Sequence, residues 1–253
     1  MTAPKPFSII LETFGGESLI RYKYLIFDVD GTLLNFSSAY LQAQQTVAKT
    51  LGISFSQEFV QMDEKLSLEL WDEFGLSHVE DETVQQNYHS LYDAYLRKHF
   101  ACIARAFGVR AETDAVLHAY YTGLSSSRKP MAPDTLALYE ELSQQHTMII
   151  ATNGLGQVQR SRLRDFLPMT ARLYISEEVG CIKPSALFFK RIIDDLGRAP
   201  SECLMIGDSI SSDINGAKHA GMATCWYNCK GSSSNPKTAD YQISKLCELL
   251  PLT

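Results

Sequence analysis

The chain has 253 residues, of which 45% are hydrophobic and 21% are charged, and its formal net charge is −6. This length allows one large domain or a core domain that carries a substantial insertion. The acidic balance excludes long nucleic acid as a partner, because nucleic acid requires a basic surface. It does not exclude a small anionic substrate, since a metal ion and a few local cations reverse the field inside a cleft.

Cysteine and hydropathy patterns bear on the compartment of the protein. None of the six cysteines forms a CxxC pair, so we expect free thiols in a reducing cytoplasm. No stretch reaches the roughly 18 apolar residues that a membrane-spanning helix requires, so no membrane association is expected. Residues 1–20 lack the pattern of a signal peptide and are predicted to be a short strand or a loose extension without an assigned role.

The first predicted strand, at about residues 22–29, ends in the sequence Asp28-Val29-Asp30-Gly31-Thr32. Side chains two positions apart on an extended chain face the same way, so the two carboxylates converge beyond the strand end, and Gly31 allows a sharp turn there. Two such anions repel by roughly 4 kcal/mol at ~4 Å and an effective dielectric constant of ~20. The pair therefore predicts a bound cation or a shared proton, and hence a candidate reaction centre.

Residues 37–125 show helical periodicity and no convincing strand. The apolar positions recur every three to four residues, at Phe55, Phe59, Met62, Leu66, Leu70 and Phe74, and again at Val84, Tyr88, Leu91, Tyr95, Phe100, Ile103 and Phe107. Gly75 and Gly108 follow these runs as C-terminal caps. A further short helix is predicted around residues 116–124, and residues 125–130 read as a linker that closes an all-helical insertion.

After this linker, predicted strands and helices alternate. Strands are expected at residues 148–151, 173–175, 203–206 and 224–227, and helices at residues 133–145, 185–196 and 212–219. Such alternation is typical of a parallel, doubly wound α/β sheet, in which the continuous apolar strands are covered on both faces.

Polar residues follow two more of the predicted strands, at Thr152-Asn153 and at Asp208. In a parallel sheet these strand ends share one edge with Asp28 and Asp30, which favours a common site. Thr152 and Asn153 read either as the start of a loop that caps the next helix or, with Gly154, as ligands of a phosphate oxygen. A carboxylate at Asp208 suits a hard divalent cation such as Mg²⁺.

Lys183 and Asp213 both stand at predicted helix starts. Lys183 precedes Pro184, and a cation at a helix start opposes the helix dipole unless an anion is bound there as well. The alternative is a solvated surface lysine. Two interpretations of Asp213 fit the sequence equally well: a metal ligand, or an acid in the first turn of a helix, where the helix dipole favours negative charge.

Taken together, these motifs resemble the haloacid dehalogenase superfamily. Its four motifs are matched in order by Asp28-Val29-Asp30-Gly31-Thr32, Thr152-Asn153, Lys183-Pro184 and Gly207-Asp208 with Asp213. The resemblance implies a Rossmann-like core, residues 1–36 and 126–253, with a mobile all-helical cap, residues 37–125.

The resemblance also implies a role for each motif residue. Asp28 would be the nucleophile that forms an aspartyl-phosphate, and Asp30 the acid and base. Phosphate would be bound by Thr152, the backbone at Asn153, and Lys183. Magnesium would be bound by Asp28, the backbone carbonyl of Asp30 and Asp208, with Asp213 supporting it through water.

Asp30 discriminates among the activities of this superfamily. A dehalogenating member has no need of an acid there, because halide leaves without a proton, so the motif favours hydrolysis of phosphate esters. A sugar-phosphate phosphatase, a phosphohexomutase and a non-catalytic binding protein remain as alternatives. Residues 175–180, 207–214 and 224–228 are similar to bacterial pyrimidine 5′-nucleotidases of the superfamily, which favours a nucleoside 5′-monophosphate as substrate.

The cap should set substrate choice by closing over the site. Its aromatic residues Tyr40, Trp71, Tyr88, Tyr92 and Tyr95 are predicted to pack the core of the cap rather than to stack on a base, because aromatic side chains dominate core energetics. Phe36 is the predicted substrate contact. We expect a small phosphorylated metabolite as partner and a monomer or homodimer.

Overall fold

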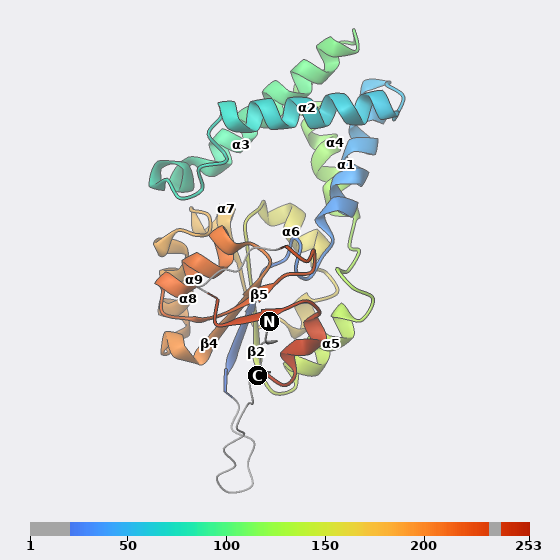
Figure 1. Ribbon diagram of the computed structural model, residues 1–253. Helices are drawn as coiled ribbons and strands as arrows, with labels where there is room; N and C mark the ends of the chain where they lie inside the picture. The colour runs from blue at the N-terminus through green and yellow to red at the C-terminus, as the bar shows by residue number, and fades with distance from the viewer. Residues whose placement is uncertain (1–20, 233–238) are drawn as a thin grey trace, which may run out of the picture.

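The computed structural model describes residues 21–232 and 239–253, so the expectation for residues 1–20 lies outside the described residues. An α/β core carries a cap of helices above one edge of its sheet (Figure 1). The fold class predicted from the sequence, a Rossmann-like parallel sheet with an inserted helical cap, is confirmed.

The sheet of the described chain has six parallel strands in the order β3-β2-β1-β4-β5-β6. They are β1 (Tyr24–Phe27), β2 (Thr147–Thr152), β3 (Arg172–Ile175), β4 (Cys203–Gly207), β5 (Ala223–Tyr227) and β6 (Tyr241–Ile243). Phe27 at the end of β1 lies in register with Ile150 of β2 and Ile206 of β4. All strands therefore end at one edge, and that edge faces the cap (Figure 1).

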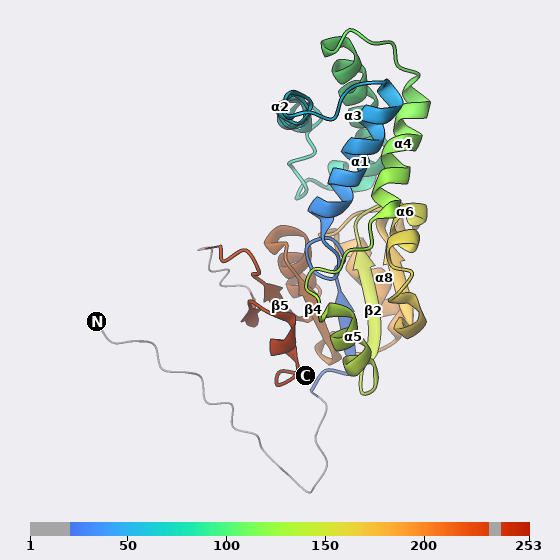
Figure 2. The ribbon, with the colours of Figure 1, turned by 90° about the vertical axis from the view of Figure 1, so that its right-hand side faces the viewer.

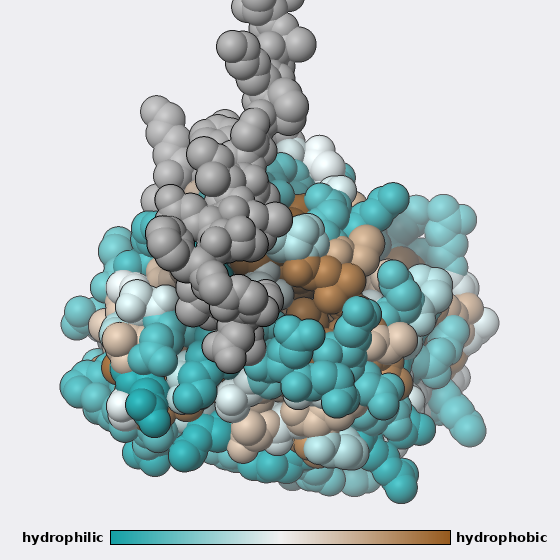
Figure 3. Space-filling view, turned by 90° about the horizontal axis from the view of Figure 1, so that it is seen from below, coloured by the Kyte–Doolittle hydropathy of each residue, from teal (hydrophilic) through white to brown (hydrophobic). Residues whose placement is uncertain are grey.

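Helices cover both faces of the sheet, as the continuous apolar strands predict. Leu25 and Phe27 of β1 point into a core shared with α5 (Thr135–Ser143), and Ile26 points into a second core shared with α8 (Ala186–Leu196). The remaining helical segments of the core are α6 (Gly156–Arg162), η1 (Leu167–Met169), α7 (Ser176–Val179), η2 (Pro200–Glu202), η3 (Ile210–Asn215), α9 (Gly216–His219) and η4 (Leu246–Leu249). The visible part of the face opposite the cap is mostly hydrophilic, with a small apolar patch near its centre (Figure 3).

The cap consists of α1 (Phe36–Leu51), α2 (Gln57–Glu73), α3 (Glu82–Ala106) and α4 (Thr113–Ser126). Helices α1 and α4 run side by side as its stalk, and α2 and α3 lie across the top (Figures 1 and 2). The stalk helices approach so closely that a Cβ at Gly123 would lie 2.4 Å from the Cα of Ala43, so only glycine fits there. Among the described residues, no helix is both long and apolar enough to cross a membrane.

Several element boundaries differ from the prediction. The helix expected at residues 212–219 is divided into η3, a π-helical turn, and α9, because the Ser209 side chain accepts from the N–H of Ser212 and starts the turn earlier. Strand β6 was not predicted, since three residues at a sheet edge are too few to show a periodic pattern. The helical block extends over residues 36–126, and the domain boundaries at 36/37 and 125/126 stay a prediction.

Candidate active site

The polar residues predicted at three strand ends converge at the cap-facing edge of the sheet. Asp28 directly follows β1, Thr152 ends β2 and Asp208 directly follows β4. The backbone N–H of Asp28 donates to the carbonyl of Ile206 at 2.9 Å, which continues the pairing of β1 with β4. Carboxylate oxygens of Asp28, Asp208 and Asp213 lie within 4.8 Å of one another.

Gly31 makes the approach of Asp208 possible. Its φ of +96° lies in the left-handed region, which glycine adopts without strain. A Cβ at this position would stand 2.4 Å from Oδ2 of Asp208, so any other residue would push that carboxylate out of the cluster.

Lys183 is buried in the middle of the site. Its side chain is 1% exposed, so the alternative of a solvated surface lysine is wrong. Its ammonium donates to Oδ1 of Asp28 at 2.7 Å, to Oδ1 of Asp213 at 2.6 Å and to the carbonyl of Ala151 at 2.8 Å. Burial lowers the pKa of Lys183, but Asp213 and Asp28 raise it by more, so the amine stays protonated.

The predicted placement of Lys183 at a helix start is also wrong. Helix α8 begins at Ala186, with Ser185 as the N-cap that accepts from the N–H of Leu187. Lys183 therefore lies outside the first turn, where the helix dipole would oppose it. Serine satisfies a free amide at the helix start, which Pro184 cannot do.

The acidic cluster carries more negative charge than Lys183 balances. Burial, opposed by Lys183 and reinforced by Asp213, raises the pKa of Asp28 to about 7. Burial and the Asp28 carboxylate raise the pKa of Asp208 to about 6. Three carboxylates around one point fit a hard divalent cation such as Mg²⁺, which binds oxygen ligands.

Asp213 turns inward from η3. Its Oδ1 accepts from Lys183, and its Oδ2 accepts from the backbone N–H of Ser209 at 3.1 Å. The reading of Asp213 as a first-turn acid alone is therefore incomplete. Its support of a metal through water stays a prediction.

Asp30 faces away from the acidic cluster and towards helix α6. Its Oδ2 accepts from Nε2 of Gln159 at 2.9 Å, and its Oδ1 lies 2.6 Å from Nη1 of Arg162 in an ion pair. The two acids of the first motif thus have different surroundings: Asp28 contacts an ammonium among other carboxylates, and Asp30 contacts a guanidinium and an amide. Such a difference allows two carboxylates to take different roles.

Gln159 and Arg162 were missed by the sequence reasoning. They lie three residues apart on α6, on one face of the helix, and both are 2% exposed. Gln159 also donates to Oγ1 of Thr152 at 2.8 Å, and Nε of Arg162 donates to the carbonyl of Ser127 at 3.4 Å. Two long polar side chains at this spacing, on the helix that follows Thr152-Asn153, were the signal available.

Thr152 and Asn153 do not cap the next helix, so that alternative is wrong. The N-cap of α6 is Leu155. The Asn153 side chain instead donates to the carbonyl of Lys183 at 3.0 Å and accepts from its N–H at 2.8 Å, which fixes the lysine loop. The backbone at Asn153 and Gly154 borders the cavity above the site, and its predicted contact with phosphate stays a prediction.

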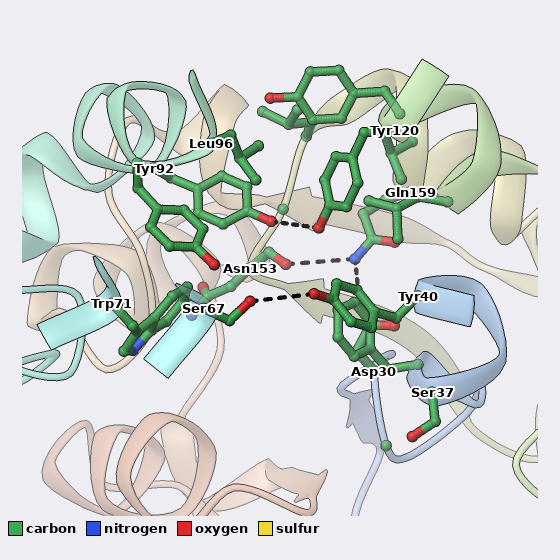
Figure 4. Close-up of a pocket in the computed structure, with 18 of the residues that line it drawn as sticks. Asp30, Ser37, Tyr40, Ser67, Trp71, Tyr92, Leu96, Tyr120, Asn153 and Gln159 are labelled. Carbon is green, nitrogen blue, oxygen red and sulfur yellow. Dashed lines mark hydrogen bonds between the residues drawn. The ribbon is translucent and has the colours of Figure 1, made fainter. Parts of the chain in front are cut away.

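A cavity of about 800 Å³ lies between the core and the cap. Its floor, on the side of the core, includes Asp30, Asp208, Asn153 and Gln159, and the cap lines it mainly with aromatic rings. Of these rings, Tyr92 and Tyr120 lie on the side opposite Asp30 (Figure 4). The cap touches the core beside this cavity, where Nε2 of His89 lies 3.0 Å from Oγ of Ser176.

The prediction that the cap aromatics pack the core of the cap is confirmed, and the structure adds that the same rings border the cavity. Tyr95 is buried in the cap core, and four more rings pack partly against it, yet all five also border the cavity: Tyr40, Trp71, Tyr88, Tyr92 and Tyr95. The cap has few layers, so a ring can pack on its neighbours on one side and face the cavity on the other. Phe36 also borders the cavity, and its predicted contact with the substrate stays a prediction.

The parallel sheet, the helical cap and the acid cluster are those of a capped hydrolase with a Rossmann-like core. Residues 22–221 match the model of the haloacid dehalogenase-like hydrolases, and the chain belongs to this family. The predicted resemblance is thereby confirmed, and the chain is an enzyme of the hydrolase class.

The chain is similar to three bacterial proteins over most of its length. It is 28% identical to the HAD-hydrolase YfnB of Bacillus subtilis, over 90% of this chain and 94% of that protein. It is 27% identical to the pyrimidine 5′-nucleotidase PynA of Streptococcus pneumoniae (82% and 84% covered) and 26% identical to the pyrimidine 5′-nucleotidase YjjG of Escherichia coli (83% and 87%). A crystal structure of YfnB, described as bound to magnesium and as showing interdomain movement, superposes with a TM-score of 0.77 over 92% of this chain and 98% of that one.

Proposed function

We propose that this chain is a Mg²⁺-dependent phosphatase that hydrolyses small organic phosphate monoesters through an aspartyl-phosphate on Asp28. The observation that carries the proposal is the position of Asp28, which lies against the Lys183 ammonium and within a cluster of three acids that fits a divalent cation. An anionic nucleophile needs such compensation before it can approach an anionic phosphate.

The residues of the site divide the reaction into two steps. A carboxylate oxygen of Asp28 forms a bond to phosphorus while the bond from phosphorus to the ester oxygen breaks, and Asp30 gives a proton to that oxygen. Asp30 then takes a proton from water as the water oxygen attacks phosphorus, and the bond from phosphorus to Asp28 breaks. Thr152, the backbone at Asn153 and Lys183 hold the phosphoryl oxygens. Asp28, the Asp30 carbonyl, Asp208 and Asp213 would hold a bound Mg²⁺, which would supply charge compensation and orientation.

The ion pair of Asp30 with Arg162 supports ester hydrolysis over dehalogenation. The second acid is present, and the guanidinium and the Gln159 amide hold its carboxylate at the floor of the cavity. A leaving alkoxide requires a proton, whereas a leaving halide does not.

We propose a nucleoside 5′-monophosphate as the substrate, hydrolysed in the cytoplasm by a monomer or homodimer. Two relatives of this chain bear the name pyrimidine 5′-nucleotidase, and the cavity above the acids is large enough for a nucleoside. A sugar phosphate, hydrolysed or isomerised, is the alternative.

The experiment measures inorganic phosphate released by the purified full chain from p-nitrophenyl phosphate, UMP, dUMP, TMP and glucose 1-phosphate. We expect release that requires Mg²⁺ and stops with a chelator, and a loss of about a thousandfold or more in Asp28→Asn. Absence of release from every ester would contradict the phosphatase, and full turnover by Asp28→Asn would contradict the nucleophile. Isomerised hexose phosphate without net phosphate release would show a mutase instead.

A further inference from the structure

The upper half of the cavity differs chemically from its floor. Rings from all four cap helices line it: Tyr40 from α1, Trp71 from α2, Tyr88, Tyr92 and Tyr95 from α3, and Tyr120 and Tyr121 from α4. The rings form an ordered set: Tyr88 stacks on Tyr92 at 6.0 Å between centroids and an angle of 10°, and Trp71 meets the edge of Tyr95 at 5.4 Å. Such walls favour a planar, apolar-faced ligand.

Two apolar side chains that border this cavity are exposed to solvent. Leu68 is 76% exposed and Phe36 is 42% exposed, although both border the cavity. A ligand that lies between them and the aromatic walls would bury both. A polyol would gain little from these surfaces, because its hydroxyls need polar partners to replace water.

A pair of hydroxyls lies within the aromatic walls. The hydroxyls of Tyr92, on α3, and Tyr120, on α4, are 2.9 Å apart and hydrogen-bonded to each other, on the side of the cavity opposite Asp30 (Figure 4). Burial raises the pKa of both phenols well above its ordinary value, so both stay protonated. One of the two O–H groups serves the mutual bond, and the other has no acceptor among the described residues.

We propose that this half of the cavity is a subsite for the nucleobase of the substrate, with the aromatic rings against its faces and the Tyr92–Tyr120 pair on its polar edge. The proposal rests on the proposed function, since the phosphate end of the same molecule occupies the acidic floor. The pair offers one free donor and several lone pairs, which match the alternating carbonyl and N–H groups of a base edge. A sugar phosphate without a base would leave that donor buried and unpaired.

The test compares kcat/KM for UMP with kcat/KM for ribose 5-phosphate, which carries the same phosphoryl group without a base. We expect the wild type to prefer UMP by about a hundredfold. Tyr92→Phe and Tyr120→Phe remove one hydroxyl and keep the ring, so each should lower the preference about fivefold to tenfold. Trp71→Ala removes a wall and should lower it as well.

The matched control is Tyr139→Phe, which removes a hydroxyl in the core, where it is bonded to Thr170 and does not border the cavity. It should leave the preference for UMP unchanged. Uridine should inhibit hydrolysis of ribose 5-phosphate competitively in the wild type, and about fivefold to tenfold less well in Tyr92→Phe.

The outcomes separate the two proposals. Hydrolysis of both esters at equal kcat/KM, or equal losses on both esters in the tyrosine variants, would overturn the subsite and leave the phosphatase standing. Hydrolysis of p-nitrophenyl phosphate but of neither UMP nor ribose 5-phosphate would also overturn the subsite. Absence of hydrolysis of these two esters and of every other ester of the panel would overturn the proposed function itself. Thermal unfolding of each variant shows that a loss does not come from misfolding.

Discussion

The core and the cap each bury a charged cluster, and they use it in opposite ways. In the core, Lys183 contacts Asp28 and Asp213, two of the three carboxylates in the acidic cluster. One ammonium cannot balance three carboxylates, so the cluster keeps a negative charge. In the cap, Asp63 is 3% exposed at its side chain, and both of its carboxylate oxygens have hydrogen-bonding partners within the protein. Its carboxylate accepts from Tyr40 at 2.6 Å, from Gln44 at 2.7 Å and, through the other oxygen, lies 2.7 Å from Nε2 of His99.

This difference indicates that the core and the cap have separate roles. The charge of the core is available to a metal ion and a phosphate, because it is not balanced within the protein. The Asp63 carboxylate of the cap has its hydrogen bonds met by side chains of α1 and α3, so it joins these helices to α2 and fixes the positions of Tyr40 and His99 at the cavity. Changes to the core cluster should therefore affect turnover first, and changes to the cap cluster should affect stability first.

The largest effect is expected from Lys183→Met. The variant leaves Asp28 and Asp213 without their ammonium and removes the positive charge that faces the phosphate. We expect turnover to fall about a thousandfold. The free energy of unfolding at neutral pH should fall by about 3–5 kcal/mol, because the buried carboxylates lose their partner.

Steady-state kinetics with p-nitrophenyl phosphate and urea unfolding check both expectations. Lys190→Met is the control, since Lys190 is an exposed lysine of α8 paired with Asp194. If the Lys183→Met enzyme kept more than a tenth of wild-type turnover, the lysine would have no essential part in the reaction.

A smaller loss is expected from Arg162→Ala. The guanidinium holds Oδ1 of Asp30 at 2.6 Å, and Asp30 should then lose its orientation towards the leaving oxygen. We expect kcat to fall about tenfold to a hundredfold with little change in KM. This loss is smaller than the full contribution of a general acid and base, because Asp30 itself is still present. Arg162→Lys keeps the charge without the planar fork and should recover only part of the loss.

Arg160→Ala provides the matched control on the same helix. Arg160 is half exposed and pairs with Glu178, away from Asp30. Equal kcat values for the two alanine variants would show that Arg162 does not position Asp30.

Arg162 also marks the limit of what the sequence could predict. Asp28, Asp30, Thr152 and Asp208 were found because each directly follows an apolar strand, and parallel strands bring their ends together without knowledge of packing. Arg162 and Gln159 lie within a helix, and only the position of that helix over the sheet brings them to Asp30.

The cap shows the same limit. Its helices were predicted from local periodicity. Periodicity indicates that a ring is half-buried, but it does not indicate what the other side of the ring faces. Tyr92 and Trp71 therefore read as core residues until the packing of α2, α3 and α4 defined the cavity. The inward turn of Lys183 was hidden for a similar reason, because its partners are distant in sequence.

The smallest effect on turnover is expected from Asp63→Asn, in the cap. The amide cannot accept from all three donors, so buried hydrogen-bonding groups of Tyr40, Gln44 and His99 lose a partner. We expect the free energy of unfolding at pH 7 to fall by about 2–4 kcal/mol, since hydrogen bonds to a buried charge are involved. Turnover of p-nitrophenyl phosphate should change less than threefold, because the acidic floor is untouched.

The dependence of this loss on pH follows from the pKa of Asp63. Burial raises that pKa, but the hydrogen bonds from His99 and Tyr40 lower it by more, so it lies below the ordinary value of 3.8 in the folded protein. A carboxyl group with a lowered pKa contributes stability above its unfolded pKa and loses it as the pH falls through the folded one. The difference in stability between wild type and Asp63→Asn should therefore shrink as the pH falls below about 4. Urea unfolding measured from pH 7 to below pH 4 tests this expectation. The control is Asp72→Asn, which changes an exposed acid of the same helix, and its free energy of unfolding should differ from that of the wild type by less than about 0.5 kcal/mol. A cap variant that lost turnover as severely as Lys183→Met would contradict the division between a charged, reactive core and a cap whose buried acid is fully hydrogen-bonded.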